Sequence, residues 1–211
     1  GASGGIGEAT AKRIAAEGGM LALLGRDPDR TRAVAEKTGA FYFSCTDITQ
    51  PGECSRVIED VTAEKGHLDV LINNAGAIIR ADTCDTTDEQ WRSVMAINLD
   101  AAFFLSREAI KVMRRQPREC AIVNVSSING FVGRKTLTAY SAGKGALIQM
   151  TQSMALDCAE YGIRVNAVCP GATDTPMPFS QHKSTVTREQ VSESLEENIP
   201  MKRMGRPEEI A

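Results

Sequence analysis

The chain has few aromatic residues, few histidines and no long apolar run. Only 5% of its 211 residues are aromatic and only two are histidine. No apolar stretch reaches the roughly 18 residues that cross a membrane. The net charge of −3 provides no basic surface for nucleic acid. These absences argue against a membrane protein and against a nucleic-acid-binding protein.

The six cysteines form no closely spaced pair. The sequence has no Cys-x-x-Cys motif, and the two histidines add little to a metal-binding set, so we expect no metal site. Reduced, partly buried thiols are typical of a cytoplasmic protein. We therefore expect a cytoplasmic location.

What the chain does have is a regular alternation of apolar runs and helical patterns. Alternation of this kind predicts an α/β fold, with a doubly wound parallel sheet and helices on both faces. The length of 211 residues and the 42% hydrophobic content fit a single domain over residues 1–211. The predicted strands are Met20–Leu24, Ala40–Phe43, Leu68–Ile72, Ala121–Val125 and Arg164–Val168.

A glycine-rich turn precedes the first helical pattern. Gly1, Gly5 and Gly7 lie in this turn, and Ala and Ile residues then repeat at helical spacing as far as Gly18. Glycines let backbone N–H groups approach a phosphate, and a helix N-terminus favours negative charge. By itself the pattern fits a phosphate site and a flexible turn equally well.

Polar residues follow two of the predicted strands. Asn73 and Asn74 come after one strand, and Ser126 and Ser127 come after another. Ligands of open α/β sheets bind at the carboxyl ends of the strands, so we expect these residues near a site. For the two asparagines, the alternative is a simple turn.

Tyr140 and Lys144 lie four residues apart in a segment, Thr138 to Tyr161, with a helical pattern. This spacing places both side chains on one face of a helix. A nearby ammonium group favours the phenolate, so the pair suits general acid/base chemistry, although such pairs also occur by chance. The hydroxyl of Ser127, thirteen residues upstream of Tyr140, could hold a substrate oxygen.

Taken together, the motifs resemble those of the short-chain dehydrogenase/reductase family, including its 3-oxoacyl-ACP reductase and glucose dehydrogenase-like members. The matching motifs, in family order, are Gly1-xxx-Gly5-x-Gly7, Asn73-Asn74-Ala75-Gly76, Asn98, Ser127, Tyr140-xxx-Lys144 and Pro170-Gly171. The resemblance covers essentially the whole chain. It implies a Rossmann-type fold and an NAD(P)-dependent oxidoreductase that transfers a hydride between the nicotinamide and a secondary alcohol or ketone.

The resemblance also implies catalytic roles. Tyr140 would be the general acid/base, and Ser127, favoured over Ser126 by its offset from Tyr140, would bind the substrate oxygen. Lys144 would bind the nicotinamide ribose and, with the charge of the oxidised nicotinamide, lower the tyrosine pKa. Asn98 would hold a water in a proton relay; the alternative is that it satisfies backbone groups in a kinked helix.

The cofactor site follows from the same resemblance. Asp47 would contact the adenine, Asn73 would lie near the adenine ribose, and the loop at Pro170 would hold the nicotinamide carboxamide. The implied cofactor-binding residues are Gly1, Ser3, Gly5, Ile6, Gly7, Arg26, Asp47, Ile48, Asn74, Ala75, Gly76, Tyr140, Lys144, Pro170, Gly171, Thr173 and Thr175.

The choice of cofactor depends on the residues after the strand that ends at Leu24. Gly25 stands where a carboxylate would select NAD, and Arg26 stands where NADP-preferring relatives carry a basic residue. We therefore expect NADP. NAD stays possible because Asp27 is either a ribose acceptor or the cap of the next helix.

The substrate is expected to be a small carbonyl or alcohol compound. An irregular stretch runs from Met177 to about Arg188, and we expect a lid over residues 177–197 rather than a surface insertion. The residues expected to face an apolar pocket with a few polar anchors are Ile78, Ile79, Arg80, Asn129, Phe131, Val132, Arg134 and Met177. Arg80 or Arg134 would bind an anionic tail or only water.

The resemblance further implies a homotetramer or homodimer. The helices after Thr86 and Thr138 would pair between subunits. The alternative is that their small and apolar residues form intramolecular core. The residues concerned are Ala101, Ala102, Phe104, Met150 and Met154.

Two further expectations concern the class of protein and the ends of the chain. A nucleotide-sensing binding protein on the same fold stays open, since fold does not fix function, but the four catalytic-type residues favour an enzyme. Family members carry a strand before the glycine turn, which would be central to the sheet, and a helix and strand after the region of Ala211. We therefore expect an excerpt of a longer chain, which would fold poorly alone because backbone groups would lack partners.

Overall fold

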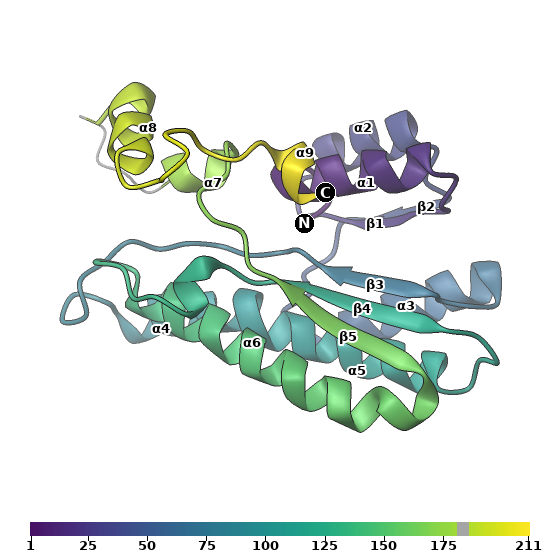
Figure 1. Cartoon of the computed structure of the whole chain (residues 1–211). Helices are drawn as coiled ribbons and strands as arrows, with labels where there is room; N and C mark the ends of the chain where they lie inside the picture. The colour runs from purple at the N-terminus through teal and green to yellow at the C-terminus, as the bar shows by residue number, and fades with distance from the viewer. Residues whose placement is uncertain (181–185) are drawn as a thin grey trace.

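The computed structural model describes residues 1–180 and 186–211. Over these ranges the chain has an α/β fold with parallel strands and helices on both sides of them (Figure 1), which confirms the expected fold class. The remaining residues, 181–185, belong to the expected lid and lie outside the described residues.

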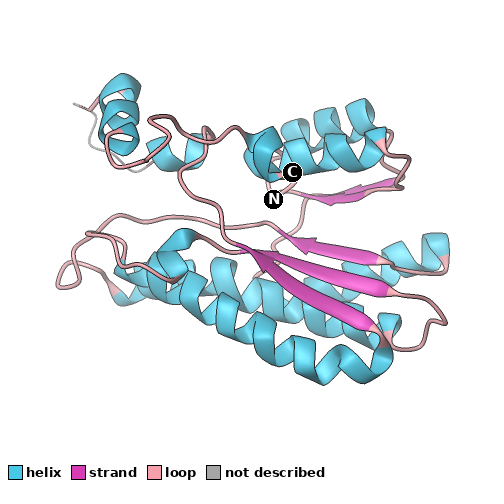
Figure 2. Ribbon diagram, viewed as in Figure 1, coloured by secondary structure: helices cyan, strands magenta, loops and turns pink. Residues whose placement is uncertain are grey.

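Each of the predicted strands is present, with ends shifted by three residues or fewer (Figure 2). The run Cys120–Val125 is buried along most of its length, as suits a Val- and Ile-rich strand covered on both faces, whereas Ile163–Val168 alternates between buried and exposed residues over most of its length. The bounds are β1 Ala22–Leu24, β2 Tyr42–Ser44, β3 Val70–Asn73, β4 Cys120–Val125 and β5 Ile163–Val168.

The strands form two parallel sheets, whereas the sequence predicts one. β1 pairs with β2, placing Leu23 opposite Phe43, and β3, β4 and β5 form a second sheet in which Ile72 lies opposite Val123. No backbone ladder joins β1 to β3 in the described ranges. In these residues the expected sheet is thus interrupted between β1 and β3, with a cavity between the two edges.

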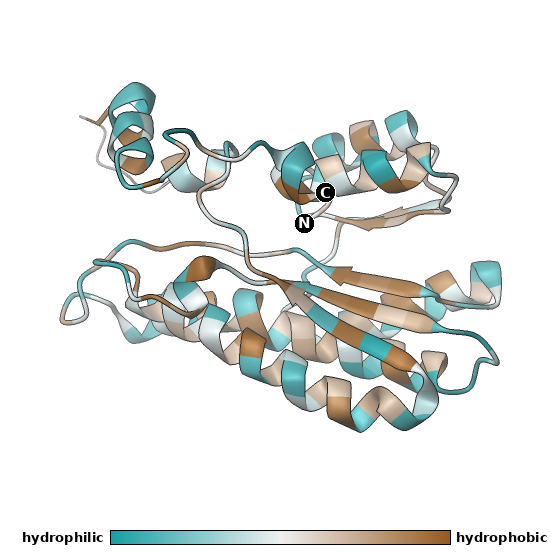
Figure 3. Ribbon diagram, viewed as in Figure 1, coloured by the Kyte–Doolittle hydropathy of each residue, from teal (hydrophilic) through white to brown (hydrophobic). Residues whose placement is uncertain are grey.

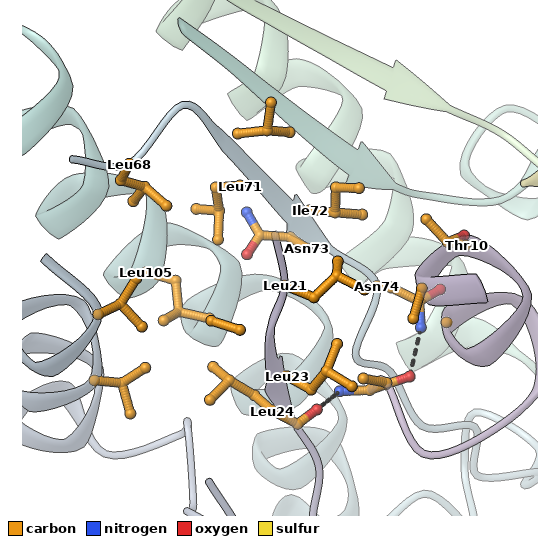
Figure 4. Close-up of a pocket in the computed structure, with 18 of the residues that line it drawn as sticks. Thr10, Leu21, Leu23, Leu24, Leu68, Leu71, Ile72, Asn73, Asn74 and Leu105 are labelled. Carbon is orange, nitrogen blue, oxygen red and sulfur yellow. Dashed lines mark hydrogen bonds between the residues drawn. The ribbon is translucent and has the colours of Figure 1, made fainter. Parts of the chain in front are cut away.

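This cavity has a volume of about 510 Å³ and is lined mainly by apolar side chains from both sheets (Figure 4). Leu23 and Ile72 face it from the two sheets, and Leu105 faces it from the helix Ala101–Met113. The Asn74 amide donates a hydrogen bond to the carbonyl oxygen of Gly1 at 2.9 Å at one end. The cavity lies where the sequence analysis expects a further strand, and that strand stays a prediction.

The helices are placed on both sides of the strands. α1, α2 and α9 lie on one side, and α4, α5 and α6 lie on the other (Figure 1). A π-helical segment, Ala96–Asp100, joins α4 to α5. The bounds are α1 Gly5–Ala16, α2 Pro28–Thr38, α3 Pro51–Lys65, α4 Asp88–Met95, α5 Ala101–Met113, α6 Thr138–Cys158, α7 Pro176–Phe179, α8 Arg188–Glu196 and α9 Pro207–Ile210.

Local sequence signals explain where α2 begins and ends. The Asp27 carboxylate accepts a hydrogen bond from the Arg30 N–H at 3.0 Å, and Pro28 occupies the first helical position. The helix ends at Gly39, whose φ of 65° is a left-handed conformation that glycine adopts without strain. Asp27 is therefore the helix cap, one of the two alternatives that the sequence left open.

The main apolar core lies between the three-stranded sheet and the helices below it. Leu105 of α5, Ile122 of β4, Met154 of α6 and Val165 of β5 are buried in this core. Apolar residues run along the same strands (Figure 3). Ala101, Ala102 and Met154 are also buried within the chain, so the alternative assignment of these three as intramolecular core is the right one.

A buried polar chain crosses the same sheet. The Asn73 amide donates to the Asn124 amide oxygen at 2.8 Å, and the Asn124 amide donates to the Thr151 hydroxyl at 2.9 Å. All three residues are buried. These bonds hold the Asn73 side chain inside the core, and the expectation that Asn73 lies near a cofactor ribose stays a prediction.

The segment after β5 is more ordered than the sequence predicts. The expected irregular stretch begins with α7, because Pro176 is favourable at the first helical position. The Arg188 guanidinium at the start of α8 pairs with the Asp174 carboxylate and lies 4.0 Å from the centre of the Phe179 ring. These contacts connect α7 and α8.

The helices and cysteines of the described ranges add two facts. No helix there is long and apolar enough to cross a membrane. The six cysteines, all within those ranges, are free thiols.

Candidate active site

Two serines follow β4, and their hydrogen bonds distinguish them. The Ser126 hydroxyl donates to the Lys144 carbonyl oxygen at 2.8 Å, so it is used to hold β4 against α6. The Ser127 hydroxyl oxygen accepts from the Asn129 N–H at 3.1 Å. That contact leaves the Ser127 proton to donate elsewhere. The geometry supports Ser127 as the serine that can face a substrate.

Tyr140 and Lys144 lie in the first two turns of α6, as the spacing predicts. Tyr140 is 7% exposed and Lys144 is 2% exposed. The Lys144 ammonium donates to the Val125 carbonyl oxygen at 2.8 Å and lies 5.9 Å from the centre of the Tyr140 ring. The end of β4 therefore fixes the lysine beside the tyrosine.

The electrostatics of this pair are dominated by burial. Burial raises the pKa of the Tyr140 phenol, and a hydrogen bond with Ser127 acts in the opposite direction. Burial lowers the pKa of Lys144 to about 8. In the protein alone, desolvation of the phenol dominates. The expected lowering of the tyrosine pKa also involves the charge of the oxidised nicotinamide, so it stays a prediction for the cofactor complex.

Asn98 occupies the π-helical segment between α4 and α5. Its amide nitrogen donates to the carbonyl oxygens of Ala77 at 2.8 Å and Val94 at 2.9 Å, and its amide oxygen accepts from the Ala77 N–H at 3.4 Å. These contacts match the alternative in which Asn98 satisfies backbone groups. The relay role stays a prediction.

The glycine turn allows a close approach of two backbone segments. A Cβ on Gly7 would lie 2.0 Å from the Gly1 carbonyl oxygen, and a Cβ on Gly1 would lie 2.8 Å from the Ala75 backbone. Gly5 has a φ of 55°. Only glycine fits these positions, and the turn leads directly into the N-terminus of α1, which favours a negatively charged ligand.

Cationic and acidic side chains lie near this turn. Arg26 is exposed, and its positive charge lowers the pKa of the Asp47 carboxyl, although hydrogen bonds from Thr49 are the larger cause. An Arg30 guanidinium nitrogen lies 2.6 Å from where a Cβ on Gly4 would stand. Sequence reasoning missed Arg30, although its position four residues after Arg26 was a usable signal.

The loop after β5 approaches the same region. The Ile128 N–H donates to the Pro170 carbonyl oxygen at 3.0 Å, which ties this loop to the segment that carries Ser127. Thr173 is buried and its hydroxyl donates to the Gly171 carbonyl oxygen at 3.1 Å. The Thr175 methyl group lies 3.0 Å from where a Cβ on Gly5 would stand. The loop therefore reaches the glycine turn.

A second cavity, of about 140 Å³, brings many of the predicted residues together. It lies where the ends of β4 and β5, α6 and the loop after β3 meet. The predicted catalytic and cofactor residues that line it are Ile6, Asn74, Gly76, Ser127, Tyr140, Lys144, Pro170, Gly171, Thr173 and Thr175. The predicted residues outside its lining are Gly1, Ser3, Gly5, Gly7, Arg26, Asp47, Ile48, Ala75 and Asn98.

The pocket prediction is correct in part. Ile78, Arg80, Asn129, Arg134 and Met177 line the cavity. Ile79, Phe131 and Val132 do not; Phe131 and Val132 point to solvent with exposures of 70% and 59%. Pro178 and Leu195, which belong to the expected lid over residues 177–197, line the cavity too. Lining residues that sequence reasoning missed include Ile128, Leu137 and Ala172.

The parallel α/β fold, the glycine turn and the buried Ser-Tyr-Lys set define a Rossmann-type oxidoreductase. A family model described as short chain dehydrogenase matches residues 1–185. The chain is 34% identical to the NADP-dependent (R)-specific alcohol dehydrogenase of Lentilactobacillus kefiri, over 98% of this chain and 82% of that protein. It is 37% identical to glucose 1-dehydrogenase of Gluconobacter oxydans (strain 621H), over 100% and 80%.

A solved structure agrees with these sequence matches. The crystal structure of levodione reductase superimposes with a TM-score of 0.93 at 30% identity, covering 100% of this chain and 84% of that one. The chain belongs to the short-chain dehydrogenase family. It is an NAD(P)-dependent oxidoreductase, as the motifs predict, and these relatives give no support to the alternative of a nucleotide-sensing protein.

Proposed function

We propose that the chain interconverts a secondary alcohol and a ketone at the Ser127, Tyr140 and Lys144 side chains, with NADP favoured over NAD. The observation that carries the proposal is the convergence of these three side chains on one cavity. Each is less than a tenth exposed. Buried, fixed polar groups of this kind stabilise charge that develops during a reaction.

The residues present fit a nicotinamide dinucleotide. The glycine turn has no room for side chains at Gly1 and Gly7, which suits the close approach of a pyrophosphate to the backbone. Gly76 and the loop from Pro170 to Thr175 would hold the nicotinamide end, since both border the cavity that contains Tyr140. When bound, the nicotinamide supplies or accepts a hydride.

The mechanism assigns one task to each catalytic side chain. Tyr140 gives its proton to the substrate oxygen during reduction and takes it back during oxidation. Ser127 donates a hydrogen bond to the same oxygen. Lys144, held by the Val125 carbonyl oxygen, places a positive charge beside the phenol. In the proposed relay, Asn98 holds a water that returns protons to Lys144.

The preference for NADP rests on the residues around the end of β1. Asp27 caps α2 and accepts the Arg30 N–H, so its carboxylate is engaged. Arg26 is exposed next to the glycine turn, and a guanidinium group pairs well with a phosphate. Arg30 lies over Gly4 and adds a second positive charge. These positions favour binding of the 2′-phosphate of NADP over the unmodified ribose of NAD.

A parallel fluorescence titration of the full-length protein with NADPH and NADH tests this preference. NADPH is expected to bind at least about 10-fold more tightly, and Arg26→Gln is expected to remove most of that difference. Arg115→Gln, which changes an exposed arginine after α5, is the matched control. Equal binding of the two cofactors contradicts the preference. Failure to bind either one contradicts the proposed function.

We also propose that residues 177–197 cover the substrate. Support comes from Met177 and Leu195, which line the cavity from α7 and α8. Deleting the contact between Arg188 and Asp174 with Arg188→Gln is expected to raise KM more than it lowers kcat, because the reaction groups lie elsewhere. If KM and kcat change by the same factor, residues 177–197 do not act as a cover over the substrate.

A homotetramer or homodimer is our proposal for the assembly. Phe103 on α5 and Leu156 on α6 are 40% and 81% exposed, and large exposed apolar side chains on neighbouring helices favour association. Light scattering that finds a monomer would contradict it. We propose a cytoplasmic location as well, supported by the free cysteines, and imaging of a tagged full-length protein tests it.

A further inference from the structure

Two arginines enter the reaction cavity from different segments of the chain. Arg80 lies in the loop after β3, and Arg134 lies in the turn before α6. The two segments are tied together, because the Ala81 N–H donates to the Thr136 carbonyl oxygen at 3.1 Å and Ala81 pairs with Leu137 in an isolated parallel bridge. The arginines are therefore held at a common wall of the cavity.

Arg80 is only partly satisfied by the protein. One of its terminal nitrogens donates to the Pro178 carbonyl oxygen at 3.3 Å. Its Nε is buried and has no hydrogen-bond partner among the residues that the structure describes. A guanidinium group carries five donors, and a buried donor without a partner is costly. The side chain therefore has donors left for a ligand.

The charges around Arg80 also point to an anion. In residues 1–180 and 186–211, neither Arg80 nor Arg134 forms an ion pair with a carboxylate. The sequence from 181 to 185 contains no Asp or Glu. Burial and the positive charge of Arg134 lower the pKa of Arg80. Two like charges facing one small cavity favour a negatively charged occupant.

We propose that the substrate carries a carboxylate, which Arg80 and Arg134 bind while Ser127 and Tyr140 act on the carbonyl or alcohol oxygen. The inference rests on the proposed function, because the same cavity holds both sets of groups. The planar guanidinium fork matches a carboxylate.

A purely structural role for Arg80 gives a different expectation. Its contact with the Pro178 carbonyl oxygen could simply position α7. Loss of Arg80 would then weaken the binding of every ligand of the cavity to the same extent, whether the ligand is charged or neutral. The ratio of the dissociation constants of an acid and its neutral ester therefore distinguishes anion recognition from positioning.

The experiment measures binding to the full-length protein loaded with NADP, by calorimetry, so that no turnover is needed. The probes are acetoacetate, levulinate and pyruvate, each beside its methyl ester, together with inorganic phosphate. At least one acid is expected to bind about 10-fold more tightly than its ester. Arg80→Gln is expected to weaken the binding of that acid by about 10- to 100-fold and to leave the affinity for the ester within about twofold of the wild type.

Arg134→Gln is expected to lower the affinity for the acid less, by about threefold, because this side chain is exposed. Arg80→Lys keeps the charge but loses the fork, so it should restore part of the affinity. Arg115→Gln is the control for a change of net charge. The inference is wrong if no acid binds more tightly than its ester, or if Arg80→Gln weakens both alike. If phosphate binds more tightly than every acid, the inference of a carboxylate is wrong and the substrate is a phosphate ester instead.

Failure of this inference can be told apart from failure of the proposed function. If neutral ketones such as 2-butanone and cyclohexanone are reduced with NADPH while no acid is preferred, only the carboxylate inference fails. If acids bind through Arg80 while no carbonyl compound, acid or ketone, is reduced, the site recognises anions and the oxidoreductase proposal fails.

Discussion

The two halves of the candidate site use different parts of the chain. At the ends of β4 and β5 and on α6, the functional groups are side chains, and Ser127, Tyr140 and Lys144 are all buried. At the start of α1, the proposed cofactor surface is backbone that only glycine can form at Gly7, and Arg26 is exposed. In our proposal, chemistry therefore depends on burial, whereas cofactor binding depends on space and on exposed charge.

This difference has a consequence for mutation. Tyr140 lies on α6 and Arg26 follows β1, so the two side chains belong to different elements of the chain. Changes at Tyr140 should affect rate, and changes at Arg26 should affect cofactor affinity. Variants that mix the two effects would show that the halves are not independent.

The largest expected effect comes from Tyr140→Phe. This change removes only the phenol hydroxyl, so the ring stays in the apolar cluster with Val94 and Leu137. Turnover is expected to fall by about 1,000-fold because the general acid is lost. The NADPH dissociation constant should stay within about twofold. Steady-state rates and fluorescence titration check both, and retained turnover would contradict the role of Tyr140.

Ser127→Ala should follow, with kcat lower by about 100-fold because one hydrogen-bond donor to the substrate oxygen is lost. Ser126→Ala is the matched control. Its hydroxyl donates to the Lys144 carbonyl oxygen, so its loss should cost about 1 kcal/mol of unfolding free energy and leave kcat nearly unchanged. Urea unfolding and steady-state kinetics separate the two. The reverse pattern would assign the reaction to Ser126.

The third prediction concerns the pH dependence of stability. The pKa of Lys144 is about 8 in the folded protein, below the ordinary value of 10.5, so the unfolded chain binds more protons between these values. The unfolding free energy of the wild type should therefore rise with pH in this window relative to Lys144→Met. The expected gain from pH 8 to pH 10 is about 2 kcal/mol.

Urea unfolding of both proteins at pH 7, 8, 9 and 10 measures this difference. Lys37→Met, which changes an exposed lysine at the end of α2, is the matched control. Parallel curves for the wild type and Lys144→Met would show that Lys144 is not desolvated as described.

The fourth prediction concerns Gly7→Ala, which is expected to lower the free energy of unfolding by about 2 kcal/mol. The new Cβ would meet the Gly1 carbonyl oxygen, and one of the two backbone segments would have to move. Gly52→Ala in α3 is the control, because a Cβ there meets nothing within 4 Å and should stabilise the helix by about 0.5–1 kcal/mol. Thermal unfolding compares the two, and equal effects would refute the close approach.

Much of the fold could be predicted because its signals are local. The strands follow from apolar runs, and α6 follows from the periodicity after Thr138. The separation into two sheets could not be predicted from these signals, because it depends on which strands lie next to each other. The burial of Asn73 was missed for a similar reason, since its partners Asn124 and Ser106 are distant in the sequence.

The site was predicted better in position than in electrostatics. The spacing of Tyr140 and Lys144 placed both on one helix face, and the structure confirms it. Sequence spacing reports a nearby charge but not the loss of water around the phenol, which raises the pKa of Tyr140 in the protein alone. Arg80 was expected in the pocket, but its unpartnered Nε is visible only in three dimensions.

The most direct test compares NADPH affinity and kcat at saturating NADPH in two variants, Tyr140→Phe and Arg26→Gln. The account predicts that Tyr140→Phe loses about 1,000-fold in kcat with nearly unchanged affinity. Arg26→Gln should lose about 10-fold in NADPH affinity with nearly unchanged kcat. If both variants lose rate and affinity in the same proportion, the division of the site into a reacting half and a binding half is contradicted.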